Sequence, residues 1–219
     1  MAFKRKKAPP LEATRQQLLE AAGAVFAERG FRAATIRQIC RSAGANVAAV
    51  HYHFGGKTDL YVQVLLHAHR CAGERHPAEL ALAAGRRPAP SRELEVFVHA
   101  FLQRLFEEGR TAWLGKLMAR EMIDPTAALD AVVAEQIQPS SKHLHGVLRR
   151  LLGAGAGRGQ IRLCEMSVVS QCLFYHHCRP VISRLFPGFD FGPAALRRLA
   201  AHITRFSLAG LRGVRKGLD

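Results

Sequence analysis

The sequence lacks an apolar run of the length that a membrane-spanning helix requires, which is roughly 20 residues. The N-terminal segment is basic, but Pro9 and Pro10 and then an amphipathic segment follow it, which is not the pattern of a secretory signal. The five cysteines are odd in number and unevenly spaced, which is typical of intracellular thiols rather than of a disulfide framework. We therefore expect a cytoplasmic protein with no membrane partner.

Acidic residues are few compared with basic ones. The 219 residues include 32 Lys and Arg against 17 Asp and Glu, a net charge of +15 with uncharged histidines. The excess is densest at the N-terminal end, where residues 1–61 hold 10 basic and 4 acidic residues. Such a charge favours a polyanionic partner, with nucleic acid as the first candidate.

Strand-like alternation of apolar and polar residues is nowhere convincing, and apolar residues recur instead at helical spacing between short breakers. The pattern predicts an all-α fold of about nine helices. They are expected over 11–29, 35–43, 46–52, 57–76, 91–105, 111–123, 126–152, 165–186 and 193–214. Residues 77–90 contain three prolines and read as a linker, and the alternating glycines of 153–159 read as a loop.

Local signals mark the ends of the first helices. Gly30 lies where a C-terminal glycine is expected. Thr35, with Gln38 three residues later, fits a capping box. Gly44 ends the second helix, and Asn46 is a suitable N-cap for the third. Further along the chain, Ser91 is expected to cap the helix over 91–105, and Pro139 is expected to kink the helix over 126–152.

Three helices within about fifty residues, with a turn at Gly44-Ala45 between the second and third, form a helix-turn-helix pattern. The third helix would offer its outward residues to the major groove of double-stranded DNA. Val47, Ala48 and Ala49 are small enough to permit close approach, and Asn46 and His51 can hydrogen-bond base edges or phosphates.

Other residues around this pattern are suited to DNA. Arg37 can reach a guanine or a phosphate. Lys57 begins the fourth helix, where its charge and the exposed amides would hold a phosphate. A basic arm ahead of these helices can follow the backbone or enter the minor groove; it consists of Lys4, Arg5, Lys6 and Lys7. Tyr52 and His53 are either DNA contacts or packing residues.

These residues resemble the N-terminal DNA-binding domain of TetR-family repressors. The resemblance rests on Thr14-Arg15, Ala21-Ala22, Phe26, Gly30-Phe31, Thr35-Ile36-Arg37-Gln38-Ile39-Cys40, Ala43-Gly44-Ala45, Tyr52-His53-Phe54-Gly55-Gly56-Lys57 and Leu60. The family usually has a tyrosine where this chain has His51. The segments 46–54, 171–175 and 179–182 also resemble the CecR-like subgroup of that family.

The resemblance implies a homodimer with an effector pocket in each subunit. The family's DNA-contact positions fall on Arg37, Val47, Ala48, Ala49, His51, His53 and Lys57. Its small-molecule pocket would be lined here by Phe101, Phe106, Trp113, Met118 and Met122. Its last two helices pair between subunits. The apolar stripe of the last helix is wider than one core face needs, which also suggests a partner helix. The expected interface residues are Cys172, His176, Leu196, Leu199, Ile203, Phe206 and Leu211.

We therefore expect a DNA-binding domain over 1–56 and a helical effector-binding and dimerisation domain over 57–219. The expected function is that of a ligand-responsive repressor on a near-palindromic operator, and neither a cofactor nor an enzymatic activity is expected. Two alternatives stay open. One is a metal or redox sensor that uses Cys172, His176 and Cys178. The other is a DNA-binding protein without sequence specificity or effector.

Overall fold

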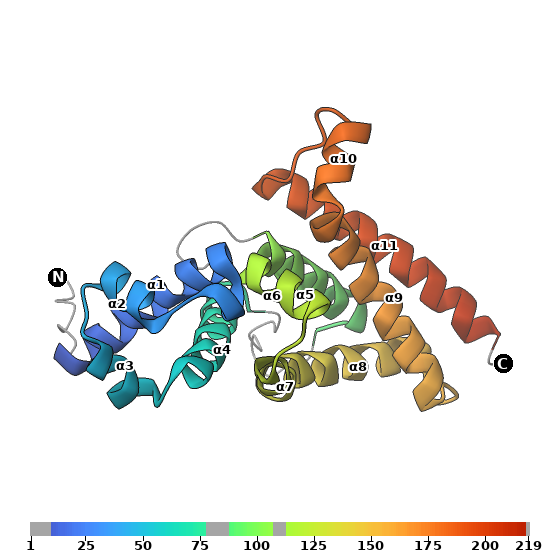
Figure 1. Ribbon diagram of the computed structural model, residues 1–219. Coiled ribbons are helices and arrows are strands. Elements are labelled where there is room, and N and C mark those ends of the chain that lie inside the picture. Colours follow the sequence, from blue (N-terminus) through green and yellow to red (C-terminus); the bar gives the residue numbers. More distant parts are fainter. Residues whose placement is uncertain (1–9, 78–87, 107–112, 218–219) are drawn as a thin grey trace, which may run out of the picture. The chain divides into compact units, whose positions relative to one another are not determined.

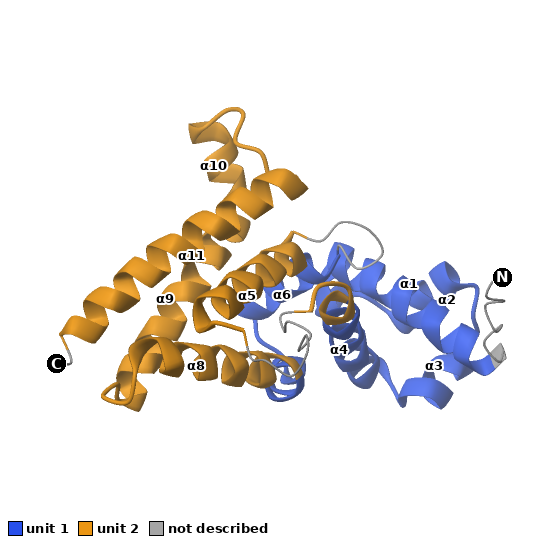
Figure 2. Cartoon of the chain, turned by 180° about the vertical axis from the view of Figure 1, so that it is seen from behind, with its two compact units in different colours: residues 1–71, 108–135 blue, residues 72–107, 136–219 orange. Residues whose placement is uncertain are grey.

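The computed structural model describes residues 10–77, 88–106 and 113–217, and every regular element in these ranges is helical (Figure 1). The predicted all-α fold is therefore confirmed. None of the described helices combines the length and the apolar character that crossing a membrane would need. The chain divides into two compact units, one of residues 1–71 and 108–135 and the other of residues 72–107 and 136–219 (Figure 2). The functional division predicted after residue 56 stays a prediction.

The first unit combines the N-terminal helices with two helices from the middle of the chain. They are α1 (Pro10–Ala33), α2 (Ile36–Ala43), α3 (Val47–Phe54), most of α4 (Lys57–Arg75), α6 (Trp113–Ile123) and α7 (Ala127–Val132). Leu18, Leu19, Phe26, Leu60 and Tyr61 are fully buried. The Phe26 and Phe31 rings each lie 4.9 Å from the Tyr61 ring, so aromatic contacts join α1 to α4.

The capping signals of this unit are confirmed. Thr35 accepts a hydrogen bond from the Gln38 backbone N–H, and the Gln38 side chain accepts one from the Thr35 N–H. Gly44 ends α2 in the left-handed conformation, with φ at 62°. Gly30 interrupts α1 with φ at 79°, although helical residues continue to Ala33. These glycines allow the chain to turn where a Cβ atom would be strained.

The second unit contains α5 (Pro90–Leu105), α8 (Gln138–Leu152), α9 (Arg158–His177), α10 (Arg179–Leu185) and α11 (Pro193–Lys216). One apolar core joins four of these helices, and Leu94, Leu144, Cys172 and Ile203 are among its members. The predicted Ser91 cap is wrong, because α5 begins at Pro90 with Ala89 as its N-cap and no side-chain capping bond. Proline suits the first turn, where its missing N–H has no helical partner.

Two predicted helices are each divided. A π-helical turn over Val133–Ile137 separates α7 from α8, just before Pro139, which cannot donate a helical hydrogen bond. The helix expected over 165–186 begins earlier, at Arg158, and ends at His177, and α10 follows after Cys178. The expected loop at 153–159 is correspondingly shorter. The start expected at residue 111 lies outside the described residues.

Candidate nucleic-acid interface

Helix α3 has one buried and one exposed side. Val50 and Phe54 are buried and hold the helix against the unit's core. Ala48, His51 and Tyr52 are exposed, and their spacing of three and four residues puts them on one face. The Asn46 side-chain oxygen accepts a hydrogen bond from the Ala48 N–H at 3.0 Å, which fixes the start of the helix. The structure thus provides a short helix that presents one face to solvent.

The other predicted DNA contacts around α3 differ in exposure. Val47 on α3 and Arg37 on α2 are exposed, whereas Ala49 and His53 are half-buried. The His53 ring lies 5.1 Å from the Tyr52 ring and 6.1 Å from the Phe54 ring, so it packs within its own helix. Tyr52 itself is 75% exposed, which makes it the most prominent aromatic side chain on this face. The predicted basic arm over 4–7 lies outside the described residues.

Lys57 is half-buried at the start of α4 and has partners within the unit. Its Nζ donates a hydrogen bond to the Arg32 carbonyl oxygen at 3.1 Å. The same ammonium lies 4.8 Å from the centre of the Phe31 ring, which is a cation–π distance. The ammonium group therefore fastens α4 to the end of α1, and its role as a phosphate contact stays a prediction.

The five predicted effector-pocket residues belong to different units. Phe101 and Phe106 lie on or just after α5 in the second unit, whereas Trp113, Met118 and Met122 lie on α6 in the first. The Phe106 ring stacks on Phe191 with 5.0 Å between ring centres. The Trp113 ring lies against Gly23 of α1, and Met122 is 54% exposed. Neither unit by itself brings these five side chains into one cavity among the residues described.

The seven residues expected at a dimer interface differ in their burial within the second unit. Cys172, Leu199, Ile203 and Leu211 belong to the core of the second unit, and Leu196 is also buried. His176 is half-buried, with its ring 5.6 Å from the Phe106 ring. The wide apolar stripe of α11 is covered by α5, α8 and α9 of the same chain, so its width does not by itself require a partner. Of the seven predicted residues, Phe206 alone is exposed, at 65%.

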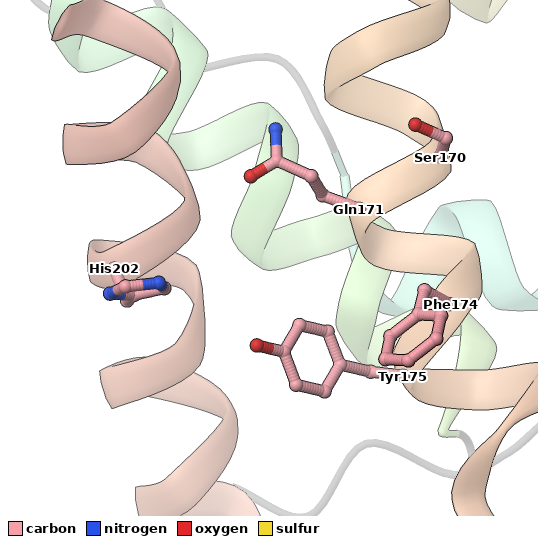
Figure 3. A pocket seen from close by; sticks show the side chains of 5 residues that line it. All are labelled: Ser170, Gln171, Phe174, Tyr175 and His202. Atoms are coloured by element: carbon pink, nitrogen blue, oxygen red, sulfur yellow. The ribbon is translucent and has the colours of Figure 1, made fainter.

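A different apolar surface was missed by the sequence reasoning. Helix α9 exposes Leu163, Met166 and Phe174, which recur at helical spacing and so were visible as a second stripe. Beside this stripe, an open hollow of about 380 Å³ lies between α9 and α11 (Figure 3). Its lining consists of Ser170, Gln171, Phe174, Tyr175 and His202.

Nothing supports the metal- or redox-sensing alternative. Cys172 is fully buried, and this burial raises the pKa of its thiol to about 12, so the reactive thiolate is disfavoured. Among the residues that the structure describes, no group of three or more His, Cys, Asp or Glu side chains is placed to hold a metal ion.

The fold and the exposed face of α3 define a helix-turn-helix DNA-binding protein. Residues 18–64 match the family of bacterial regulatory proteins called the tetR family, and residues 90–211 match the C-terminal domain of the HTH-type transcriptional dual regulator CecR. The chain belongs to the TetR family of transcriptional regulators, with a C-terminal domain of the CecR type.

Individual relatives agree with this assignment. The chain is 37% identical over 170 residues to the HTH-type transcriptional dual regulator CecR of Shigella flexneri, covering 75% of this chain and 76% of that protein. It is 28% identical over 216 residues to the HTH-type transcriptional repressor NicS of Pseudomonas putida KT2440, covering 96% of each. The crystal structure of a protein described as a transcriptional regulator of Pseudomonas aeruginosa PAO1 has a TM-score of 0.69, 21% identity and 97% coverage of both chains, which shows a shared fold.

Proposed function

We propose that this regulator is a repressor that binds a near-palindromic operator as a homodimer and leaves it when a small-molecule effector binds. The observation that carries the proposal is the arrangement of α3, which is anchored by Val50 and Phe54 and exposes Ala48, His51 and Tyr52. A major groove admits a helix of this width, and small side chains such as Ala48 allow the backbone close to the base edges.

Exposed apolar residues support the pairing of the chain with a second copy, which the binding of a palindrome requires. Helix α9 exposes a stripe of Leu163, Met166 and Phe174, and α11 exposes Phe206. Gly210 and Gly213 of α11 have open space where a Cβ atom would lie, so another helix can approach closely there. Exposed apolar stripes of this extent favour burial against a partner. In such a dimer the two α3 helices would enter successive major grooves about 34 Å apart.

The proposal that a small-molecule effector binds this protein rests on its similarity to the TetR family and not on an observed cavity. An effector that binds better to a conformation with displaced α3 helices would shift the population away from DNA. A coupling free energy of roughly 1–3 kcal/mol is usual and would lower operator affinity about 5–150-fold. Phe101 and Phe106, both half-buried against the core of the second unit, are the two predicted lining residues in that unit.

The test is the selection of bound fragments from genomic DNA, followed by footprinting. Wild type is expected to protect a site with two related halves. Ala48→Glu is expected to abolish this protection, because it places a negative charge on the exposed face of α3. Gln138→Glu, which makes the same change of charge at an exposed position of α8, is expected to bind normally. Equal binding of selected and random DNA would instead support the alternative of a DNA-binding protein without specificity.

A further inference from the structure

We infer that His51 determines operator specificity by accepting a hydrogen bond from the exocyclic amino group of a base, cytosine N4 or adenine N6, and not by contacting a phosphate. The inference rests on the proposed entry of α3 into the major groove. It goes further because it assigns a chemical preference to one side chain.

The hydrogen bond that His51 makes within the protein fixes which ring nitrogen carries the proton. Nδ1 lies 3.0 Å from the carbonyl oxygen of Gly55, just after the last residue of α3. A carbonyl oxygen only accepts hydrogen bonds, so the proton must be on Nδ1. In the neutral ring, Nε2 then has a lone pair and no hydrogen. The side chain therefore offers DNA an acceptor.

An acceptor on this face restricts the partners that His51 can have. His51 is exposed between Ala48, three residues before it, and Tyr52, the next residue. Phosphate oxygens are acceptors too, so a neutral His51 cannot bond them through Nε2. In the major groove the donors are the amino groups of cytosine and adenine, whereas guanine N7 and O6 and thymine O4 are acceptors. Every base pair carries one such amino group, on adenine or on cytosine, so Nε2 requires in each half-site a base pair whose amino group lies on the strand that faces His51.

The experiment is a selection of sites from a pool of random duplexes at about pH 8, where histidine side chains are mostly neutral. Wild type is expected to enrich one base pair, in one orientation, at one symmetry-related pair of positions, by about fivefold or more over the alternatives. His51→Phe, which lacks the Nε2 acceptor, is expected to lose that preference and to keep the rest of the operator.

A control variant separates this effect from others. His177→Phe removes another exposed histidine from the C-terminal end of a helix and should leave the operator unchanged. Enrichment of an A·T pair at the affected position would mean that His51 contacts the adenine amino group, and enrichment of a G·C pair would mean that it contacts the cytosine amino group. The inference is overturned if His51→Phe changes no position. It is also overturned if wild type binds equally well after the amino group at the affected pair is removed, by purine in place of adenine or 2-pyrimidinone in place of cytosine. If wild type selects no operator at all, the proposed function is wrong as well, and this result differs from the loss of the His51 preference alone.

Discussion

The Tyr61 hydroxyl donates a hydrogen bond of 2.7 Å to the Glu121 carboxyl group, which is 1% exposed. The Thr126 backbone N–H, at the start of α7, and the Thr126 hydroxyl also donate to this carboxyl group. All of these donors are uncharged. The buried acid is therefore satisfied by hydrogen bonds, as burial of a polar group requires, and it joins α4, α6 and the start of α7 within the first unit.

Tyr61→Phe removes one of these donors and keeps the ring. The Glu121 oxygen would stay buried with a lost partner, so the free energy of unfolding is expected to fall by about 1–3 kcal/mol. Urea denaturation would measure the change. Tyr52→Phe removes a hydroxyl from a tyrosine that is 75% exposed and is expected to leave the stability unchanged. Equal stability of both variants would mean that the Tyr61 hydrogen bond contributes nothing.

The same pair predicts a dependence of stability on alkaline pH. Burial, and next the hydrogen bond to Glu121, raise the pKa of Tyr61 above its ordinary value. The pKa in the folded state is then higher than about 10, the value for an unfolded chain. The stability that the protonated Tyr61 contributes is complete below about pH 10 and is lost as the pH rises further. Wild type should therefore lose stability above that pH more steeply than Tyr61→Phe, in unfolding curves recorded across this range.

Gly23 is predicted to be intolerant of a side chain. A Cβ atom at this position of α1 would lie 2.3 Å from ring atoms of Trp113. Gly23→Ala is therefore expected to destabilise the protein by about 1–3 kcal/mol, as overpacking does. At Gly73 of α4, no atom lies within 4 Å of a Cβ, so Gly73→Ala should stabilise by up to about 1 kcal/mol through helix propensity. Thermal unfolding would measure both variants, and a higher midpoint temperature for Gly23→Ala than for Gly73→Ala would contradict this packing.

The parts of the fold that the sequence predicted are those set by local rules. The Thr35–Gln38 capping box, the Gly44 end of α2 and the Asn46 cap act over two or three residues, and all three are present. The exposed face of α3 followed from the same local reading. The π-helical turn before Pro139 was missed because proline excludes a regular hydrogen bond without specifying which irregular turn replaces it.

The features that the sequence could not predict depend on residues that are far apart in the chain. Tyr61 and Glu121 are 60 positions apart, and no local pattern pairs them. The width of the apolar stripe of α11 suggested a partner helix, and α5, α8 and α9 of the same chain pack against it. Periodicity shows that a helix has an apolar face but not which helix covers that face. The exposed stripe of α9 could have been recognised from spacing, but its exposure depends on tertiary packing.

Lys57→Ala is expected to weaken binding to every DNA sequence and to lower the slope of the salt dependence by about one unit. The variant also loses the hydrogen bond from Lys57 to the Arg32 carbonyl, which is expected to lower the free energy of unfolding by about 1 kcal/mol. Salt titrations of DNA binding and urea unfolding would measure the two effects separately. Lys142→Ala, at an exposed lysine of α8, makes the same change of charge and should alter neither. An unchanged slope would exclude Lys57 from the phosphate contacts.

Phe206→Asp tests the proposed pairing of subunits. Phe206 is 65% exposed, so an acid there should leave the protomer folded, whereas a charge within an apolar interface should separate the subunits. Sedimentation at micromolar concentration is expected to give a dimer for wild type and a monomer for the variant, and operator binding should fall with it. Ile123→Asp, at an exposed residue of α6, is the matched control and should remain dimeric. A dimeric Phe206→Asp would exclude this part of α11 from the interface, because an unpaired carboxylate buried there would cost more than the pairing could offset.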